Sequence, residues 1–242
     1  MDIESIVARV TEEVYKQLTD TVPETSAGDL AGCLEHSLLN PDASRETIKK
    51  GCEEAKQYGF ANVCVSPYYV SMVSEILHGS GVAVCTAVGF PHGAASTKAK
   101  CAEIRDAIMN GATEQDVSMM IVAIKSGEYD AVMKDLYEMV SVAGGRAKVK
   151  AIYEQGLLGD EEREKSLRIA VKCGVDFIKI SNALTGKKAV AEDVRFVRSI
   201  VGQGVGIKID GGIKNAATVC ALLEAGANRL GCSASVNIVT GQ

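Results

Sequence analysis

The sequence is poor in the side chains that commonly bind metal ions and in the apolar segments that cross membranes. Its 242 residues include three histidines, none of them four residues from another. This leaves little from which to build a zinc or two-metal site, so we expect no metal and no cofactor. No stretch of about 18 apolar residues occurs, and no charged and then apolar start precedes a cleavage site. We therefore expect a cytoplasmic protein without a membrane span or a secretory signal.

An excess of basic charge is also missing. The formal net charge is −5 at pH 7, and lysine and arginine are scattered among acidic residues, whereas a nucleic-acid surface concentrates basic residues on one face. Small molecules are therefore the expected partners, with no nucleic acid. The eight cysteines lie singly in apolar runs and never form a C-x-x-C pair, which predicts reduced thiols in the core.

A repeat of glycines organises the chain. Gly59, Gly111, Gly174 and Gly226 each close an amphipathic segment and precede a short apolar run. Glycine at such a position ends a helix in the left-handed conformation, so each marks the helix-to-strand half of a βα unit. Reading outward from these positions predicts eight strands, near residues 34–37, 62–66, 82–88, 114–120, 148–153, 176–181, 206–210 and 229–233.

Strict alternation of strand and helix predicts a parallel sheet. Eight units of ~30 residues match a single closed (β/α)8 barrel, the TIM barrel, which we place at residues 29–242. An open doubly wound sheet is the alternative, although the glycine-rich dinucleotide motif is missing after the first strand. In a barrel, reactive side chains are expected at the C-terminal ends of the strands.

Two lysines lie in the middle of apolar runs, where a charge is costly to bury. Lys179 lies in the predicted strand 176–181 and Lys208 in the next, 206–210. Because side chains alternate along a strand, the β-branched neighbours would face the helices and both lysines the barrel interior. Each ammonium group would then lower the pKa of the other, leaving some free amine at neutral pH.

Two further charged residues are expected in the same interior. Asp116 lies in the predicted strand 114–120 and Lys150 in the strand 148–153. Several lysines around a carboxylate form a set suited to proton transfer. A lattice of buried ion pairs that only holds the barrel together is the alternative, although such pairs often gain little over apolar packing.

With these residues placed, the chain resembles the deoxyribose-phosphate aldolases, class I aldolases on a (β/α)8 barrel. The resemblance runs from about residue 34 to residue 239. Its matching stretches include Leu34-Glu35-His36-Ser37, Gly89-Phe90-Pro91-His92-Gly93 and Lys208-Ile209-Asp210-Gly211-Gly212-Ile213. It implies reversible cleavage of 2-deoxy-D-ribose 5-phosphate to acetaldehyde and D-glyceraldehyde 3-phosphate, with these sugar phosphates and aldehydes as partners. We also expect a homo-oligomer.

The resemblance also implies roles for individual residues. Lys179 matches the Schiff-base lysine, Lys208 the second lysine that lowers its pKa, and Asp116 the proton-shuttling carboxylate. Glycines after the last two strands would let backbone N–H groups approach the phosphate. The positions expected to contact substrate are Glu35, Cys64, Lys150, Ser181, Gly211, Gly212, Lys214, Gly231 and Ser233.

Several positions on the substrate loops depart from the family pattern. The family usually has Lys-Thr-Ser-Thr-Gly after the sixth strand, whereas this chain reads Lys179-Ile180-Ser181-Asn182-Ala183-Leu184-Thr185-Gly186, and Asp210 stands where a small residue is common. They leave open a related aldehyde or sugar phosphate as substrate, or a non-catalytic barrel that binds a sugar phosphate. A metal-dependent aldolase would need the histidine and acidic ligands that are scarce here.

The first 28 residues form a separate segment. Residues 1–18 carry an apolar stripe at helical spacing, and a polar linker with Pro23 follows. This predicts an amphipathic helix that either covers the N-terminal face of the barrel or docks to another protein. It resembles the encapsulation peptides that load enzymes into bacterial microcompartments, and docking to such a shell would place the protein inside one.

Overall fold

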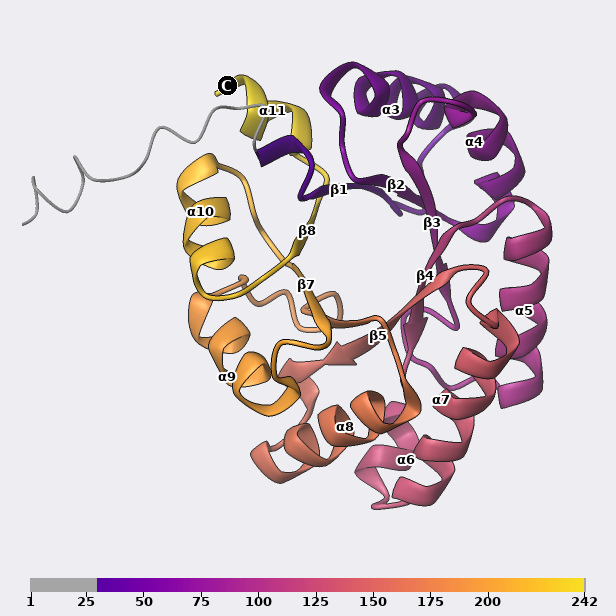
Figure 1. The fold of residues 1–242 in the computed structure, drawn as a ribbon, viewed down its shortest axis with the longest axis vertical. Coiled ribbons are helices and arrows are strands. Elements are labelled where there is room, and N and C mark those ends of the chain that lie inside the picture. The colour runs from indigo at the N-terminus through magenta and orange to yellow at the C-terminus, as the bar shows by residue number, and fades with distance from the viewer. Residues whose placement is uncertain (1–29, 242) are drawn as a thin grey trace, which may run out of the picture.

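The computed structural model describes residues 30–241, so the predicted N-terminal helix lies outside the described residues. Eight parallel strands form one closed barrel in the order β1 to β8, and the helices surround it (Figure 1). The strands are β1 Leu34–Leu38, β2 Asn62–Val65, β3 Ala83–Val88, β4 Glu114–Ser118, β5 Lys148–Glu154, β6 Phe177–Ser181, β7 Gly206–Asp210 and β8 Arg229–Cys232. The predicted (β/α)8 barrel is confirmed, and the open doubly wound sheet is excluded.

The helices follow the strands in the expected alternation. They are α3 Arg45–Tyr58, α4 Val70–Leu77, α5 Thr97–Met109, α6 Ile121–Lys125, α7 Tyr129–Ala143, α8 Asp160–Cys173, α9 Ala191–Val201, α10 Ala216–Glu224 and α11 Ser235–Thr240, with single 3-10 turns at Pro67–Tyr69 and Gln155–Leu157. The four marker glycines all have positive φ, between 73° at Gly59 and 107° at Gly226. They therefore end helices for the conformational reason that the sequence suggested.

The register of the sheet decides which side chains share the barrel interior. Lys179 on β6 is the direct neighbour of Lys208 on β7, and Asp116 on β4 is the neighbour of Lys150 on β5. Side chains at paired positions of adjacent parallel strands point to the same face. The predicted interior position of these four charged residues is therefore confirmed.

The apolar core lies between the barrel and its helices. Ile178, Ile180, Ile207 and Ile209, which alternate with the interior residues, are fully buried in it. Thiols in the described part are free at Cys33, Cys52, Cys64, Cys85, Cys101, Cys173 and Cys232. None of the helices within residues 30–241 is long and apolar enough to cross a membrane.

Candidate active site

Lysines and carboxylates alternate through the barrel interior. The Lys179 Nζ lies 3.1 Å from the Asp210 Oδ2 and 3.0 Å from the Asp116 Oδ2. The Lys208 Nζ lies 2.6 Å from the same Asp116 oxygen and also pairs with Glu35. One carboxylate therefore joins the two lysines that the sequence placed on neighbouring strands.

Lys150 continues this arrangement away from Lys179. Its Nζ lies 2.8 Å from the Glu35 Oε1, 2.6 Å from the Glu114 Oε2 and 3.4 Å from the Asp116 Oδ1. We call the resulting series the charged ladder; it consists of Asp210, Lys179, Asp116, Lys208, Glu35, Lys150 and Glu114. Apart from Asp210 at one end, its side chains are almost completely buried. Buried charges require such paired neighbours, because each unpaired charge costs several kcal/mol.

The charge state of Lys179 differs from the prediction. Burial lowers the pKa of this amine and Lys208 lowers it further, but Asp116 and Asp210 outweigh both, so the net pKa lies above its ordinary value. The expectation that Lys208 lowers the pKa of Lys179 enough to leave a free amine is therefore wrong. Lys179 is an ammonium group, and a base must take its proton before it can act as a nucleophile.

Asp116 is held in its ionised form. Burial raises the pKa of this carboxyl, but Lys208, Lys179 and Lys150 together lower it well below its ordinary value. Three ammonium groups around one carboxylate fix the geometry of all four side chains. They also make Asp116 a weak proton acceptor as long as all three remain charged.

The stability that Glu35 contributes to the fold depends on pH. Burial raises the pKa of Glu35, but Lys150 and Lys208 lower it to about 2 from its ordinary 4.5. A carboxyl with a lower pKa in the folded state contributes stability above pH 4.5 that is lost as the pH falls towards 2. The full contribution is about 3 kcal/mol, of which about 2 kcal/mol disappears by pH 3.

We expect Glu35→Gln to remove this part of the pH dependence. Urea unfolding at pH 6 and pH 3 measures the free energy of unfolding for both proteins. The wild type should lose about 2 kcal/mol more than the variant between these pH values. Equal losses would mean that Glu35 does not stabilise the fold through its ionised form. The exposed Glu53, which pairs with Lys56 on the surface, provides the control variant Glu53→Gln.

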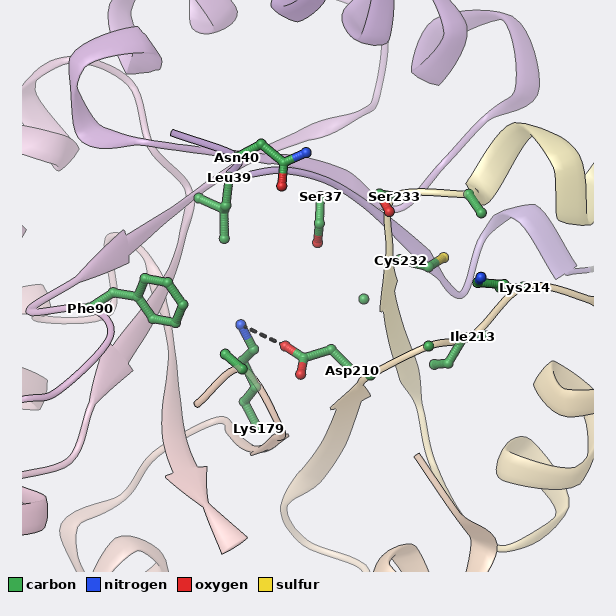
Figure 2. Close-up of a pocket in the computed structure, with 15 residues that line it drawn as sticks. Ser37, Leu39, Asn40, Phe90, Lys179, Asp210, Ile213, Lys214, Cys232 and Ser233 are labelled. Carbon is green, nitrogen blue, oxygen red and sulfur yellow. Dashed lines mark ion pairs between the residues drawn. The ribbon is translucent and has the colours of Figure 1, made fainter. Parts of the chain in front are cut away.

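A cavity of about 400 Å³ opens at the Lys179 end of the ladder (Figure 2). Six of the predicted site residues line it: Lys179, Gly211, Gly212, Lys214, Gly231 and Ser233. The remaining lining residues are Ser37, Leu39, Asn40, Phe90, Ala183, Asp210, Ile213, Cys232 and Ala234. The residues belong to the C-terminal ends of β1, β6, β7 and β8 and to the loops after β1, β3, β6, β7 and β8, which is where a barrel enzyme is expected to bind its substrate.

The other predicted residues do not line this cavity. Glu35, Lys150 and Asp116 belong to the ladder, and Cys64 is buried beside Cys85. The Cys85 thiol donates to the Asp116 Oδ1 over 3.4 Å. Ser181 is buried, and its Oγ accepts a hydrogen bond from the Ala183 N–H. Among them, Asp116 contacts Lys179, which does line the cavity.

The loops after β7 and β8 line the cavity and contain backbone donors without a protein acceptor. Within the described part, no protein group accepts a hydrogen bond from the backbone N–H of Gly212, Ile213 or Ser233. Gly211 has φ 122°, and a Cβ there would approach the Lys187 carbonyl oxygen to 2.9 Å. Successive free N–H groups in such a turn form a concave site for an anion. Lys214 adds a positive charge on the same wall.

Sequence reasoning did not include Phe90 and Asp210 among the site residues. The Lys179 Nζ lies 5.7 Å from the centre of the Phe90 ring. Phe90 was present in the Gly-Phe-Pro-His-Gly motif, and Asp210 occupies the same face of β7 as Lys208. The alternation of side chains along β7 could therefore have identified Asp210 as a residue of the barrel interior.

Two groups of possible metal ligands occur among residues 30–241. They are Cys64 with Cys85 and Asp116, and Glu35 with Cys85 and Glu114, each within 4.8 Å of one another. The carboxylates of both groups already pair with lysines of the ladder. The positive charge that a metal ion would bring is thus supplied by ammonium groups.

The sequence of this chain is similar to those of known aldolases. Residues 27–238 match the sequence model of the DeoC/LacD family aldolases. The chain is 44% identical over 211 residues to the deoxyribose-phosphate aldolase of Bacillus mycoides (strain KBAB4), covering 87% of this chain and 95% of the relative. It is also 44% identical over 218 residues to that of Caldanaerobacter subterraneus subsp. tengcongensis, with coverages of 89% and 94%.

Solved structures show the same relationship. The aldolase QR15 superimposes with a TM-score of 0.84 at 32% identity, covering 88% of this chain and 95% of that one. The tetrameric deoxyribose phosphate aldolase of Aeropyrum pernix gives a TM-score of 0.83 at 29% identity, with coverages of 89% and 92%. The family model spans most of the sequence, and the relatives are matched over nearly their whole length. The chain therefore belongs to the DeoC/LacD family of aldolases.

Proposed function

We propose that this protein is a class I deoxyribose-phosphate aldolase. It would reversibly cleave 2-deoxy-D-ribose 5-phosphate to acetaldehyde and D-glyceraldehyde 3-phosphate, which makes it a carbon–carbon lyase. The observation that carries the proposal is the Lys179 ammonium at the floor of a 400 Å³ cavity, in contact with two carboxylates. Relatives that are 44% identical over most of the chain bear the name of this activity.

The chemistry follows from an amine nucleophile. Lys179, once deprotonated, attacks the C1 aldehyde carbon, and loss of water gives a protonated imine. The imine accepts the electron pair of the C2–C3 bond while the C3 hydroxyl loses its proton, which releases D-glyceraldehyde 3-phosphate. Asp116 with a water molecule then carries a proton to C2 of the enamine. Hydrolysis of the new imine releases acetaldehyde.

The substrate phosphate would bind at the loops after β7 and β8. Gly212, Ile213 and Ser233, whose N–H groups have no acceptor in the described part of the protein, line the cavity there together with Lys214. Gly231 also leaves space for neighbouring side chains, because a Cβ at this position would lie 3.2 Å from both the Asp210 Cβ and the Lys208 Cε. The absence of a side chain at Gly231 thus makes room for two members of the ladder.

Reductive trapping tests the proposal. The protein is incubated with acetaldehyde and borohydride, and peptide mass analysis locates the adduct. A stable adduct on Lys179, together with cleavage of 2-deoxy-D-ribose 5-phosphate that survives a chelator, supports the assignment. An adduct without cleavage of this sugar phosphate favours a related aldehyde substrate. Failure to form any Lys179 adduct across a series of aldehydes would leave only a non-catalytic barrel that binds sugar phosphates.

We also propose a homo-oligomer, supported by the tetrameric Aeropyrum pernix structure. Residues 1–28 are proposed to dock the protein inside a bacterial microcompartment. The family model begins only at residue 27, and 211 aligned residues already cover 95% of the Bacillus mycoides relative. These relatives therefore have little sequence outside the barrel that could form a lid. This favours docking over a lid as the role of residues 1–28.

Deletion of residues 1–28 distinguishes docking from a barrel lid. We expect the truncated protein to keep its melting temperature and its activity, and to lose association with purified shell proteins. A lower melting temperature after deletion would instead assign the segment to the N-terminal face of the barrel. Differential scanning calorimetry and co-sedimentation with shells measure the two properties.

A further inference from the structure

Asp210 differs from the other ladder carboxylates in exposure and in partners. Its side chain is 22% exposed and lines the cavity, whereas the Asp116 side chain is 0% exposed. Among residues 30–241, Lys179 is the only cationic side chain within ion-pair distance of Asp210, while Asp116 pairs with three. The two carboxylates that contact Lys179 are thus chemically unequal.

This inequality matters because Lys179 has to lose a proton. Asp116 is held ionised by Lys150, Lys179 and Lys208, so accepting a proton there would break favourable contacts with three cations. A proton on Asp210 would disturb only one ion pair, and that pair ends in any case when Lys179 becomes neutral. Asp210 also faces the cavity, through which an aldehyde reaches the amine (Figure 2).

The position of the Asp210 carboxylate is fixed by the unusual loop after β6. Its Oδ1 accepts a hydrogen bond from the Asn182 N–H over 3.3 Å, and the Asn182 side-chain amide donates to the Asp210 carbonyl oxygen over 3.3 Å. This leaves the Oδ2, 3.1 Å from the Lys179 Nζ, directed at the nucleophile. The missing side chain at Gly231 gives the Asp210 Cβ its space. The altered loop and Asp210 are therefore parts of one arrangement.

We propose that Asp210 is a catalytic residue, the base that takes the proton from Lys179 and returns it to the oxygen that leaves as water. The inference rests on the proposed role of Lys179 as the Schiff-base lysine. It adds to Asp116 a second carboxylate with a different role, because Asp210 serves imine formation at nitrogen whereas Asp116 serves proton transfer at carbon.

The proposed steps balance without any further reactant. The Lys179 ammonium gives one proton to Asp210, and the amine attacks the aldehyde carbon, so that a C–N bond forms and the carbonyl electron pair moves to oxygen. Protonated Asp210 gives its proton to this oxygen and then takes a second proton from nitrogen. It gives that proton to the hydroxyl as the C–O bond breaks. Water leaves, the imine keeps one N–H and its positive charge, and Asp210 is again a carboxylate.

The test compares rates of imine formation in Asp210→Asn and the wild type. Acetaldehyde and cyanoborohydride are mixed with the full chain, and the adduct on Lys179 is followed by mass spectrometry at pH 6 to 9. General-base catalysis contributes about 10²-fold or more, so we expect adduct formation at pH 7 to be slower by about that factor, with a smaller deficit at pH 9. Asp210→Glu should recover part of the rate.

A purely electrostatic role predicts the opposite result. Removing Asp210 takes away one of the two carboxylates that raise the pKa of Lys179, which by itself would give more free amine and faster adduct formation. An equal or faster rate in Asp210→Asn therefore overturns the inference. If the wild type itself forms no adduct on Lys179, the proposed function fails instead, so the two failures are distinguishable.

Two controls separate catalysis from folding. Asp106→Asn changes the same functional group on an exposed face of α5, where its partner is Asn110, and should match the wild-type rate. Asp210→Ala with added formate tests chemical rescue, because a small carboxylate can enter the cavity left by the side chain. Formate restoring the rate supports the proposal, and no restoration in a variant with a normal melting transition counts against it.

Discussion

Replacing Lys179 with methionine is expected to abolish aldol cleavage. Methionine fills a similar volume but has no amine, so the imine cannot form, and removal of a covalent nucleophile costs about 10⁴-fold or more in kcat. The Lys179 adduct should disappear together with the activity. Cleavage of 2-deoxy-D-ribose 5-phosphate and peptide mass analysis after borohydride treatment measure the two effects.

Loss of activity in this variant has to be separated from loss of the ladder. Lys179→Arg keeps a positive charge between Asp116 and Asp210 but offers no nucleophilic amine, so it should be equally inactive while unfolding at a temperature closer to the wild type. Lys134→Met, at a side chain that is 79% exposed, is the control and should be fully active. Activity above about one per cent in Lys179→Met would contradict the imine route.

The second large effect is expected at the centre of the ladder. Lys208→Met removes the cation that joins Asp116 to Glu35, and two buried carboxylates then share fewer positive partners. Removing one member of a buried ion pair costs about 3–5 kcal/mol, which for a domain of this size lowers the melting temperature by roughly 10 °C. Urea and thermal unfolding measure the change.

A double variant shows whether the stability lost in Lys208→Met comes from the carboxylate that is left without its cation. Lys208→Met with Glu35→Gln removes one positive and one negative charge, so it should be more stable than the sum of the two single variants predicts. Additive losses would mean that Lys208 stabilises the barrel through its aliphatic chain alone. Lys125→Met, which breaks a pair with Glu162 on the surface, should change the free energy of unfolding by about 1 kcal/mol or less.

The barrel could be predicted because its signals are local. The marker glycines and the alternation along each strand placed all eight strands within about two residues, and the same alternation put Lys179 and Lys208 inside. The charge state of Lys179 could not be predicted in this way. It depends on Asp116 and Asp210, which reach the amine from β4 and β7, and only the closed sheet brings those carboxylates to 3.0 and 3.1 Å.

Only some contacts of the charged ladder could be predicted from the sequence. Glu114, at the start of β4, was not expected to pair with Lys150, because that contact depends on the register between β4 and β5. Glu35 was expected at the substrate, but its carboxylate lies between Lys150 and Lys208. Such distances are set by the tilt and closure of the whole sheet, which no single strand encodes.

Between formation of the imine and its hydrolysis, the Lys179 nitrogen loses its positive charge at one stage only. The protonated imine carries the same single positive charge as the ammonium it replaces, so Asp116 keeps its three cationic neighbours while substrate is attached. Breaking the carbon–carbon bond turns the imine into an uncharged enamine, and Asp116 is left with two. Its affinity for a proton therefore rises at the moment when a proton has to be delivered to carbon, and falls again once that delivery restores the charge on nitrogen.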